Sequence, residues 1–104
     1  MVLTLLKPKM KARKTIKIND FQLHILLNEE EQKGFQILQN NSFCTACKEE
    51  RPLSNIQEIM LNDLNDIIVE GTCPVCGGKM ARYMEFGEDH AFSKKTDLFR
   101  KQIQ

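Results

Sequence analysis

The chain has 104 residues, 41% of them hydrophobic and 28% charged, which fits one small globular domain and excludes a disordered chain. No stretch approaches the ~18 apolar residues of a membrane span. The net charge of +1 excludes a uniformly basic or acidic chain, but residues 1–28 hold six Lys/Arg and one acidic residue, whereas the rest hold nine and thirteen.

The N-terminal basic residues form a candidate nucleic-acid-binding arm, placed at residues 1–14. A basic arm can neutralise phosphates or another acidic surface, and the alternative is a solubilising terminus. No aromatic residues lie between the cations, so the arm is not expected to recognise bases. The cations, including one just beyond the arm, are Lys7, Lys9, Lys11, Arg13, Lys14 and Lys17.

Residues 15–42 are predicted to form one or two strands and a helix that packs on the domain that follows. Apolar residues alternate with others in Phe21–Leu27, a period typical of a half-buried strand, and a turn would join it to a strand at 15–18. Asn28 followed by Glu31 is the pattern of a helix capping box, so a helix is expected to begin there.

The candidate metal ligands are four cysteines in two C-x-x-C pairs: Cys44, Cys47, Cys73 and Cys76. The pairs are separated by 25 residues, and the chain has no other cysteine. Two such turns placed face to face can hold a tetrahedral ion at about 2.3 Å, with no open position for a catalytic water. We therefore predict one structural Zn²⁺ and no enzymatic activity.

Other interpretations of the cysteines are weaker. Disulfides need an oxidising compartment, and the apolar segment Met1–Leu6 is shorter than the roughly 7–15 residues of a signal-peptide core, so we expect a cytoplasmic protein. A thioredoxin-like site uses one reactive pair and gives the second no role. Iron in a rubredoxin-like site is the remaining alternative, although the chain has no Trp and one Tyr to build that aromatic core.

The segment between the two pairs is ambiguous. Its apolar residues fit one helix over 54–68, but residues 62–66 are almost all Asn or Asp, which favour turns. Ile67-Ile68-Val69 is β-branched throughout. We therefore predict strands at about 56–61 and 67–72 around that turn.

A third strand is predicted at 79–86, after the second cysteine pair. The fold class that follows is α+β: a small antiparallel zinc ribbon of three short strands over residues 43–86, preceded by the strand-helix segment. Residues 87–104 are predicted to be a tail or a short helix.

The cysteine segments resemble a small zinc-ribbon family of bacterial and viral proteins. The resemblance rests on Phe43-Cys44-x-x-Cys47-Lys48 and on Gly71-Thr72-Cys73-Pro74-Val75-Cys76-Gly77-Gly78-Lys79-Met80-x-Arg82. Some related ribbons lie at the ends of DNA-handling enzymes such as topoisomerases. The resemblance implies the ribbon fold and the metal over residues 43–83, and implies little about function.

Residues beside the cysteines shape the expected site. Gly77 can adopt a positive φ after the second pair, whereas Lys48 occupies the corresponding place after the first, so the first turn should be less relaxed. Four thiolates on Zn²⁺ carry a net charge of −2. Nearby cations could offset that charge or contact a phosphate backbone; these are Lys48, Arg51, Lys79 and Arg82.

Other polar residues give weaker signals. His24 and His90 are expected to be surface residues, and Glu85, Glu88 and Asp89 to be solvated rather than an acid/base group. There is no glycine-rich phosphate loop. We expect a nucleic-acid-associated accessory that uses the arm and the cations near the cysteines; the alternative is a protein-interaction adaptor. No membrane or small-molecule partner is expected.

Overall fold

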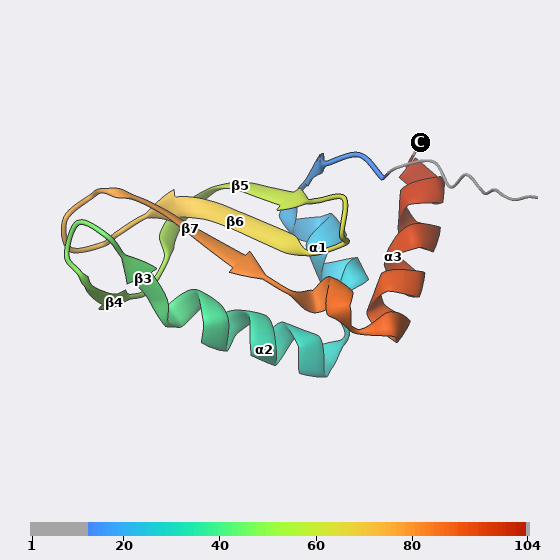
Figure 1. Cartoon of the computed structure of the whole chain (residues 1–104), viewed down its shortest axis with the longest axis horizontal. Helices are drawn as coiled ribbons and strands as arrows, with labels where there is room; N and C mark the ends of the chain where they lie inside the picture. The colour runs from blue at the N-terminus through green and yellow to red at the C-terminus, as the bar shows by residue number, and fades with distance from the viewer. Residues whose placement is uncertain (1–12, 104) are drawn as a thin grey trace, which may run out of the picture.

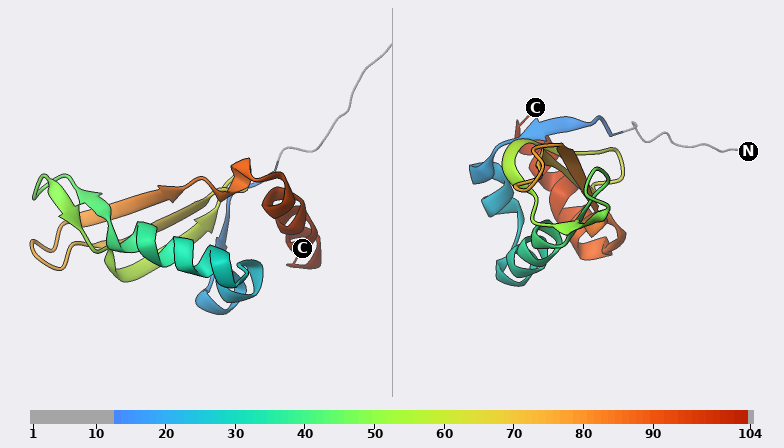
Figure 2. Two further views of the ribbon diagram at one scale, coloured as in Figure 1. Left: turned by 90° about the horizontal axis from the view of Figure 1, so that it is seen from below. Right: turned by 90° about the vertical axis from the view of Figure 1, so that its left-hand side faces the viewer.

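The computed structural model describes residues 13–103, so the predictions for Lys7, Lys9 and Lys11 lie outside the described residues. The elements form one main sheet with α1 and α2 against one face and α3 across one end (Figures 1 and 2). In chain order they are β2 (Ile16–Ile18), α1 (Asp20–Leu26), α2 (Glu29–Asn40), β3 (Ser42–Cys44), β4 (Glu49–Arg51), β5 (Ser54–Leu61), β6 (Ile67–Thr72), β7 (Lys79–Met84), the 3-10 helix η1 (Phe86–Glu88) and α3 (His90–Ile103).

The main sheet is antiparallel, with the strand order β2-β5-β6-β7. Residues on one face of each strand are buried under the helices, as Leu61, Ile67 and Met84 are at successive paired positions. The opposite face is open, and Met60 and Tyr83 both pair with Ile68 there. A separate two-stranded sheet, β3-β4, carries the first cysteine pair.

The predicted strands between and after the cysteine pairs are confirmed. β5 and β6 flank the Asn/Asp turn, where Asn62 N–H donates to the Asp66 carbonyl at 3.0 Å. β7 ends at Met84, two residues before the predicted end. The alternative helix over 54–68 is wrong, because the apolar residues of this segment pair across strands instead. The C-terminal helix forms as α3 and begins at His90.

Phe21–Leu27 is a helix, not the predicted strand. Asn19 is the N-cap: its side chain accepts from Gln22 N–H at 2.8 Å, and the Gln22 side chain accepts from Asn19 N–H at 2.9 Å. Leu23 and Leu26, three residues apart, are buried on one face. Apolar residues occur on every side of this segment, so they fit both periods, and the capping box stabilises the helix.

Helix α2 begins as predicted and delivers the chain to the first cysteine. The Asn28 side chain accepts from Glu31 N–H at 2.7 Å, and the Glu31 carboxylate accepts from Asn28 N–H at 2.9 Å. At the other end, Leu53 N–H donates to the Gln39 carbonyl at 2.8 Å and the Gln39 side chain donates back to the Leu53 carbonyl at 3.0 Å. The end of α2 is thereby fixed to the chain that enters β5.

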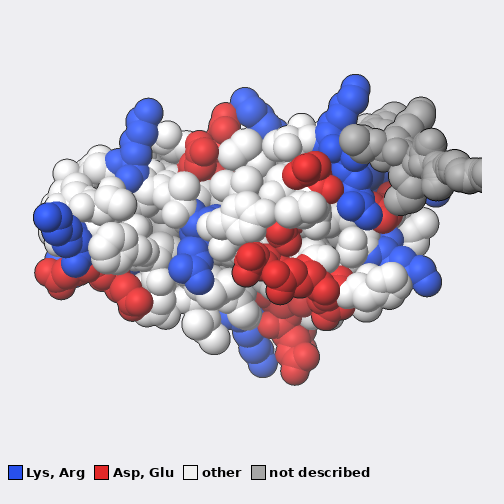
Figure 3. Space-filling model, in the orientation of Figure 1, with Lys and Arg blue, Asp and Glu red and all other residues white. Residues whose placement is uncertain are grey.

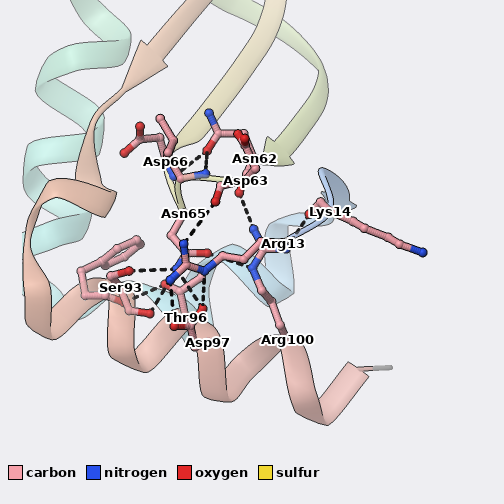
Figure 4. A network of polar contacts seen from close by, with 12 residues as sticks. Arg13, Lys14, Asn62, Asp63, Asn65, Asp66, Ser93, Thr96, Asp97 and Arg100 are labelled. Atoms are coloured by element: carbon pink, nitrogen blue, oxygen red, sulfur yellow. Dashed lines mark hydrogen bonds and ion pairs between the residues drawn. The ribbon is translucent and has the colours of Figure 1, made fainter. Parts of the chain in front are cut away.

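A polar network fixes α3 to the β5–β6 turn at the end far from the cysteines (Figure 4). Arg100 is 5% exposed; its Nε donates to Asn65 Oδ1 at 2.8 Å, and its Nη groups donate to the carbonyls of Asn62 and Lys14. Asn65 also donates to Asp97 Oδ1 at 3.0 Å. Burial lowers the pKa of Arg100, and the carbonyl acceptors compensate for its lost hydration. We call these residues the turn network: Lys14, Asn62, Asn65, Asp97 and Arg100.

Candidate metal centre

Two turns bring the four cysteines to one end of the molecule (Figure 1). Cys44 is the last residue of β3 and Cys47 lies in the turn to β4, whereas Cys73 and Cys76 lie in the connection from β6 to β7. We call these turns, residues 44–48 and 73–78, the metal end. The predicted ligands therefore come together from two different sheets.

The four sulfur atoms form a compact cluster, all within 4.8 Å of one another. Cys44 Sγ lies 3.6 Å from Cys76 Sγ, and Cys47 Sγ lies 3.8 Å from Cys73 Sγ. A tetrahedral ion with bonds of about 2.3 Å requires sulfur–sulfur separations of about 3.8 Å, whereas a disulfide bond is about 2.05 Å long. All four cysteines are free, and their spacing fits a metal ion.

Backbone N–H groups point at the sulfurs and favour their ionised form. The N–H groups of Cys47, Val75 and Gly78 donate to the sulfurs of Cys44, Cys73 and Cys76, each at 3.4 Å. Each turn is also closed by a backbone bond, from Lys48 N–H to the Cys44 carbonyl at 2.7 Å and from Gly77 N–H to the Cys73 carbonyl at 2.9 Å. The two turns therefore share the same closing backbone bond, four residues apart.

The residue after each pair has a left-handed backbone. Gly77 has φ 73° as predicted, and Lys48, its counterpart in the first turn, has φ 60°. A left-handed conformation costs an L-residue about 1–2 kcal/mol, and glycine is free of that cost. The first turn therefore holds backbone strain at Lys48.

The pKa values of two of the thiols differ widely, because each thiol is influenced by the sulfurs beside it. Burial disfavours a charged Cys73, but the N–H groups of Cys76 and Val75 lower its pKa to about 6. Arg51 favours the thiolate of Cys47, but contact with the other three sulfurs raises the pKa of Cys47 to about 11. Four thiols this close cannot all ionise unless a cation balances their charge.

The four cations near the cysteines have different positions. Arg51 lies against Cys47, whose hydrogen bond raises the pKa of the guanidinium, and its Nη2 lies 3.4 Å from a Glu49 oxygen. Lys48 and Lys79 are exposed beside the turns. Arg82 lies further along β7, on the face that the helices cover, and is not part of the cluster.

Arg13 of the arm and Lys17, just beyond it, are each paired within the chain, which the sequence did not indicate. Arg13 forms an ion pair with Asp97 at 2.7 Å, and Lys17 forms one with Glu58 at 2.8 Å. The Lys14 side chain is exposed and points away from the turn network (Figure 4). Lys9 and Lys11 lie outside the described residues.

The basic residues do not form one stripe on the face seen in Figure 3, where acidic side chains lie between the basic groups. Arg13 contacts α3, at the opposite end of the molecule from the cysteines (Figures 1 and 4). Arg13 and Lys14 therefore lie apart from the cations beside the cysteines.

The other polar candidates lie apart from the cysteines. Within residues 13–103 the cysteine cluster is the one group of three or more potential ligands close enough to share an ion. His24 and His90 are exposed, on α1 and at the start of α3. Asp89 accepts from Phe92 N–H at 3.1 Å and so caps α3, and Glu85 and Glu88 are exposed.

None of the helices in the described part of the chain combines the length and apolar character needed to cross a membrane.

Comparison with protein families gives one match within the chain. A family model described as a domain of unknown function (DUF5679) matches residues 43–83. This segment holds all four cysteines and runs from β3 into β7, the same residues that carry the resemblance to small zinc ribbons. Searches of curated proteins and of solved structures returned no match.

Proposed function

We propose that this protein is a non-catalytic adaptor that binds a protein partner and whose metal end is held together by one Zn²⁺. The metal part of the proposal is supported by the cluster of four free cysteines, all within 4.8 Å. Cys44, Cys47, Cys73 and Cys76 would fill every position of a tetrahedral ion and leave none for a reacting water. Thiolates that accept N–H bonds and lie beside Arg51 suit such a structural ion.

The ion would join parts of the chain that no strand pairing joins. The first cysteine pair belongs to the β3-β4 sheet, and the second lies between β6 and β7 of the main sheet. A bound ion would fix these sheets against each other and shape one surface from both. This is the use of zinc in small domains whose apolar core is limited.

The exposed side chains around the metal end favour a protein partner. Phe43 is 54% exposed and Val75 is 66% exposed, and exposed acidic residues, Glu49 and Glu50, lie beside Lys48. Exposed apolar side chains bordered by polar ones fit the apolar core and polar rim of a protein interface. Two of the cations predicted to contact nucleic acid, Arg13 and Lys17, are already paired.

Photo-crosslinking tests the adaptor function. A photoreactive amino acid placed at Phe43 or Val75 of the full chain should give discrete adducts with another protein in cells. The matched control is Leu98, which is 61% exposed on α3 at the opposite end. The same adducts from all three positions, or adducts with nucleic acid alone, would contradict the proposal.

Nucleic-acid binding is the second candidate, because exposed cations remain at both ends of the folded molecule. Lys14 lies at one end, and Lys48 and Lys79 at the other. Electrophoretic mobility shift with single- and double-stranded nucleic acid over a salt series tests it. Binding that weakens steeply with salt would support this candidate.

A further inference from the structure

The outer edge of β7 carries a cavity. β7 is the last strand of the main sheet, so within the described residues no strand pairs with its outer edge. A cavity of about 350 Å³ lies beside the end of this strand. It is lined by Leu38, Arg82, Tyr83, Met84, Glu85 and Phe86.

The cavity is lined by consecutive residues of the end of β7. Arg82 and Met84 pair with Val69 and Ile67 on the face that the helices cover, whereas Tyr83 pairs with Ile68 on the open face. Residues of both faces therefore line the cavity beside the end of the strand. Leu38 of α2 forms another wall. β3 also contacts β7, but it lies beside the start of the strand (Figure 1).

Arg82 lines this cavity and has one side-chain nitrogen without a hydrogen-bond partner among the described residues. Its Nε is buried and has no hydrogen-bond partner among residues 13–103, and Arg82 forms no ion pair there. Arg51 also has an unpartnered Nε, but its guanidinium contacts Cys47 and Glu49. A carboxylate is the group that best matches a partly buried guanidinium.

The β7 strand lacks the irregularity found in β5 near the opposite edge of the sheet, although α2 and β3 contact it. There β2 covers Ile59–Leu61, and the remainder of β5 has a register shift between Ser54 and Glu58 and a left-handed Asn55. Such irregularities prevent another strand from pairing. β7, by contrast, pairs with β6 in an unbroken register from Lys79 to Met84.

We propose that the outer edge of β7, at Arg82–Met84, binds an extended segment of a partner protein as an added strand. The segment carries an acidic side chain that reaches Arg82, and an apolar side chain two residues along, on the same face, contacts Leu38 and Phe86. Backbone hydrogen bonds to the free edge supply affinity, and the two side chains supply specificity. This inference rests on the adaptor function and specifies the chemistry of its partner.

Selection from a random decapeptide library displayed on phage, against the zinc-loaded full chain, tests the site. Enriched peptides should combine alternating apolar residues with an Asp or Glu, and their binding should shift the amide NMR signals of β7 and η1. Arg82→Gln should weaken binding about tenfold, the effect of losing one charged hydrogen bond. The matched control, Lys79→Gln, removes a charge from the same strand outside the cavity and should change affinity less than about twofold.

Two further comparisons separate this site from a general effect on folding. Replacing the peptide's acid by its amide should weaken binding to the natural chain and have no further effect on Arg82→Gln. N-methylation of alternate peptide residues on one edge should abolish binding. The Arg82→Gln variant should bind as much zinc as the natural chain and have the same melting temperature.

Absence of enrichment, peptides without an acid, or equal binding to Arg82→Gln would overturn the β7 site. Peptides that map to the metal end would overturn it too, but would leave the adaptor function standing. Failure of the crosslinks at Phe43 and Val75 would instead remove the adaptor contact at the metal end, whatever the peptides do.

Discussion

Asp97 of α3 accepts two hydrogen bonds from Arg13, at 2.7 Å from Nε and 3.1 Å from Nη2, across 84 residues of sequence. Arg13 also donates to the Asp63 carbonyl at 3.2 Å. The last described residues before β2 are therefore fixed to both the C-terminal helix and the β5–β6 turn. Arg13 therefore has a defined position on the surface.

The Arg13–Asp97 pair should make stability depend on acidity. The hydrogen bond from Arg13 lowers the pKa of Asp97 below 3.8, so the stabilisation is complete above that value and is lost as pH falls through the lowered pKa. Arg13→Gln should cost about 1 kcal/mol or less at pH 7, because the pair is part exposed. The difference should shrink below about pH 3.8 in urea unfolding curves; a constant difference would contradict this.

Purified protein should contain one zinc per chain, measured by elemental analysis. Structural zinc contributes about 10–16 kcal/mol of apparent binding free energy in small domains, so Cys76→Ala should unfold much of residues 43–86. The amide NMR signals of β3, β4 and the start of β7 should be the first to lose their chemical-shift dispersion. A protein without metal, or a red protein that contains iron, would contradict the assignment.

Lys48→Gly should stabilise the zinc-loaded protein by about 0.5–1 kcal/mol, because it relieves the left-handed backbone at φ 60°. Gly77→Ala should destabilise it by about 1 kcal/mol for the same reason, at φ 73°. Thermal unfolding of the two variants measures both effects. Lys48→Gln is the control: it removes the charge, keeps the strain and should leave stability nearly unchanged.

Arg100→Gln should destabilise the protein by about 2–4 kcal/mol, because it leaves buried carbonyl groups in the turn network without a donor. Lys101→Gln, at the exposed neighbouring position, should change stability by less than about 0.5 kcal/mol. Urea unfolding compares the two. Equal effects would mean that the network contributes nothing measurable.

If the chain binds nucleic acid through its N-terminal arm, removal of residues 1–12 should flatten the salt dependence of binding. Each lost phosphate contact changes the log–log slope by about 0.9 on duplex DNA and about 0.7 on single strands. The deletion must stop before Arg13, since removing Arg13 and Lys14 would also break their contacts with α3. An unchanged slope would place the contact at the other exposed cations, Lys48 and Lys79.

The parts of the structure that the sequence predicted correctly are those determined by local signals. The C-x-x-C spacing, the Asn28 capping box and the Asn/Asp turn each act within a few residues, and the cysteine cluster, α2 and the β5-β6 hairpin follow from them. The helix α1 was missed because Phe21–Leu27 fits two periods, although the Asn19–Gln22 capping box was a readable signal.

Contacts between distant parts of the chain could not be predicted in this way. The contacts of Arg100 with Asn65 and of Arg13 with Asp97 join residues 35 and 84 positions apart. The sequence therefore did not show that Arg13 and Lys17 are paired within the chain. Their charges appeared available for binding a partner. The position of Arg82 at a sheet edge likewise depends on the strand order, which no local pattern gives.

Tyr83 gives the protein a built-in optical probe. It is the sole tyrosine in a chain that has no tryptophan, so it alone determines the emission of the folded protein at tyrosine wavelengths. Its hydroxyl donates to Asp66 at 2.8 Å and accepts from Asn62 at 2.8 Å, and Tyr83 is one of the residues that line the β7 cavity. Disruption of the β5–β6 turn, or occupation of the strand edge, should therefore change the intrinsic fluorescence without any label.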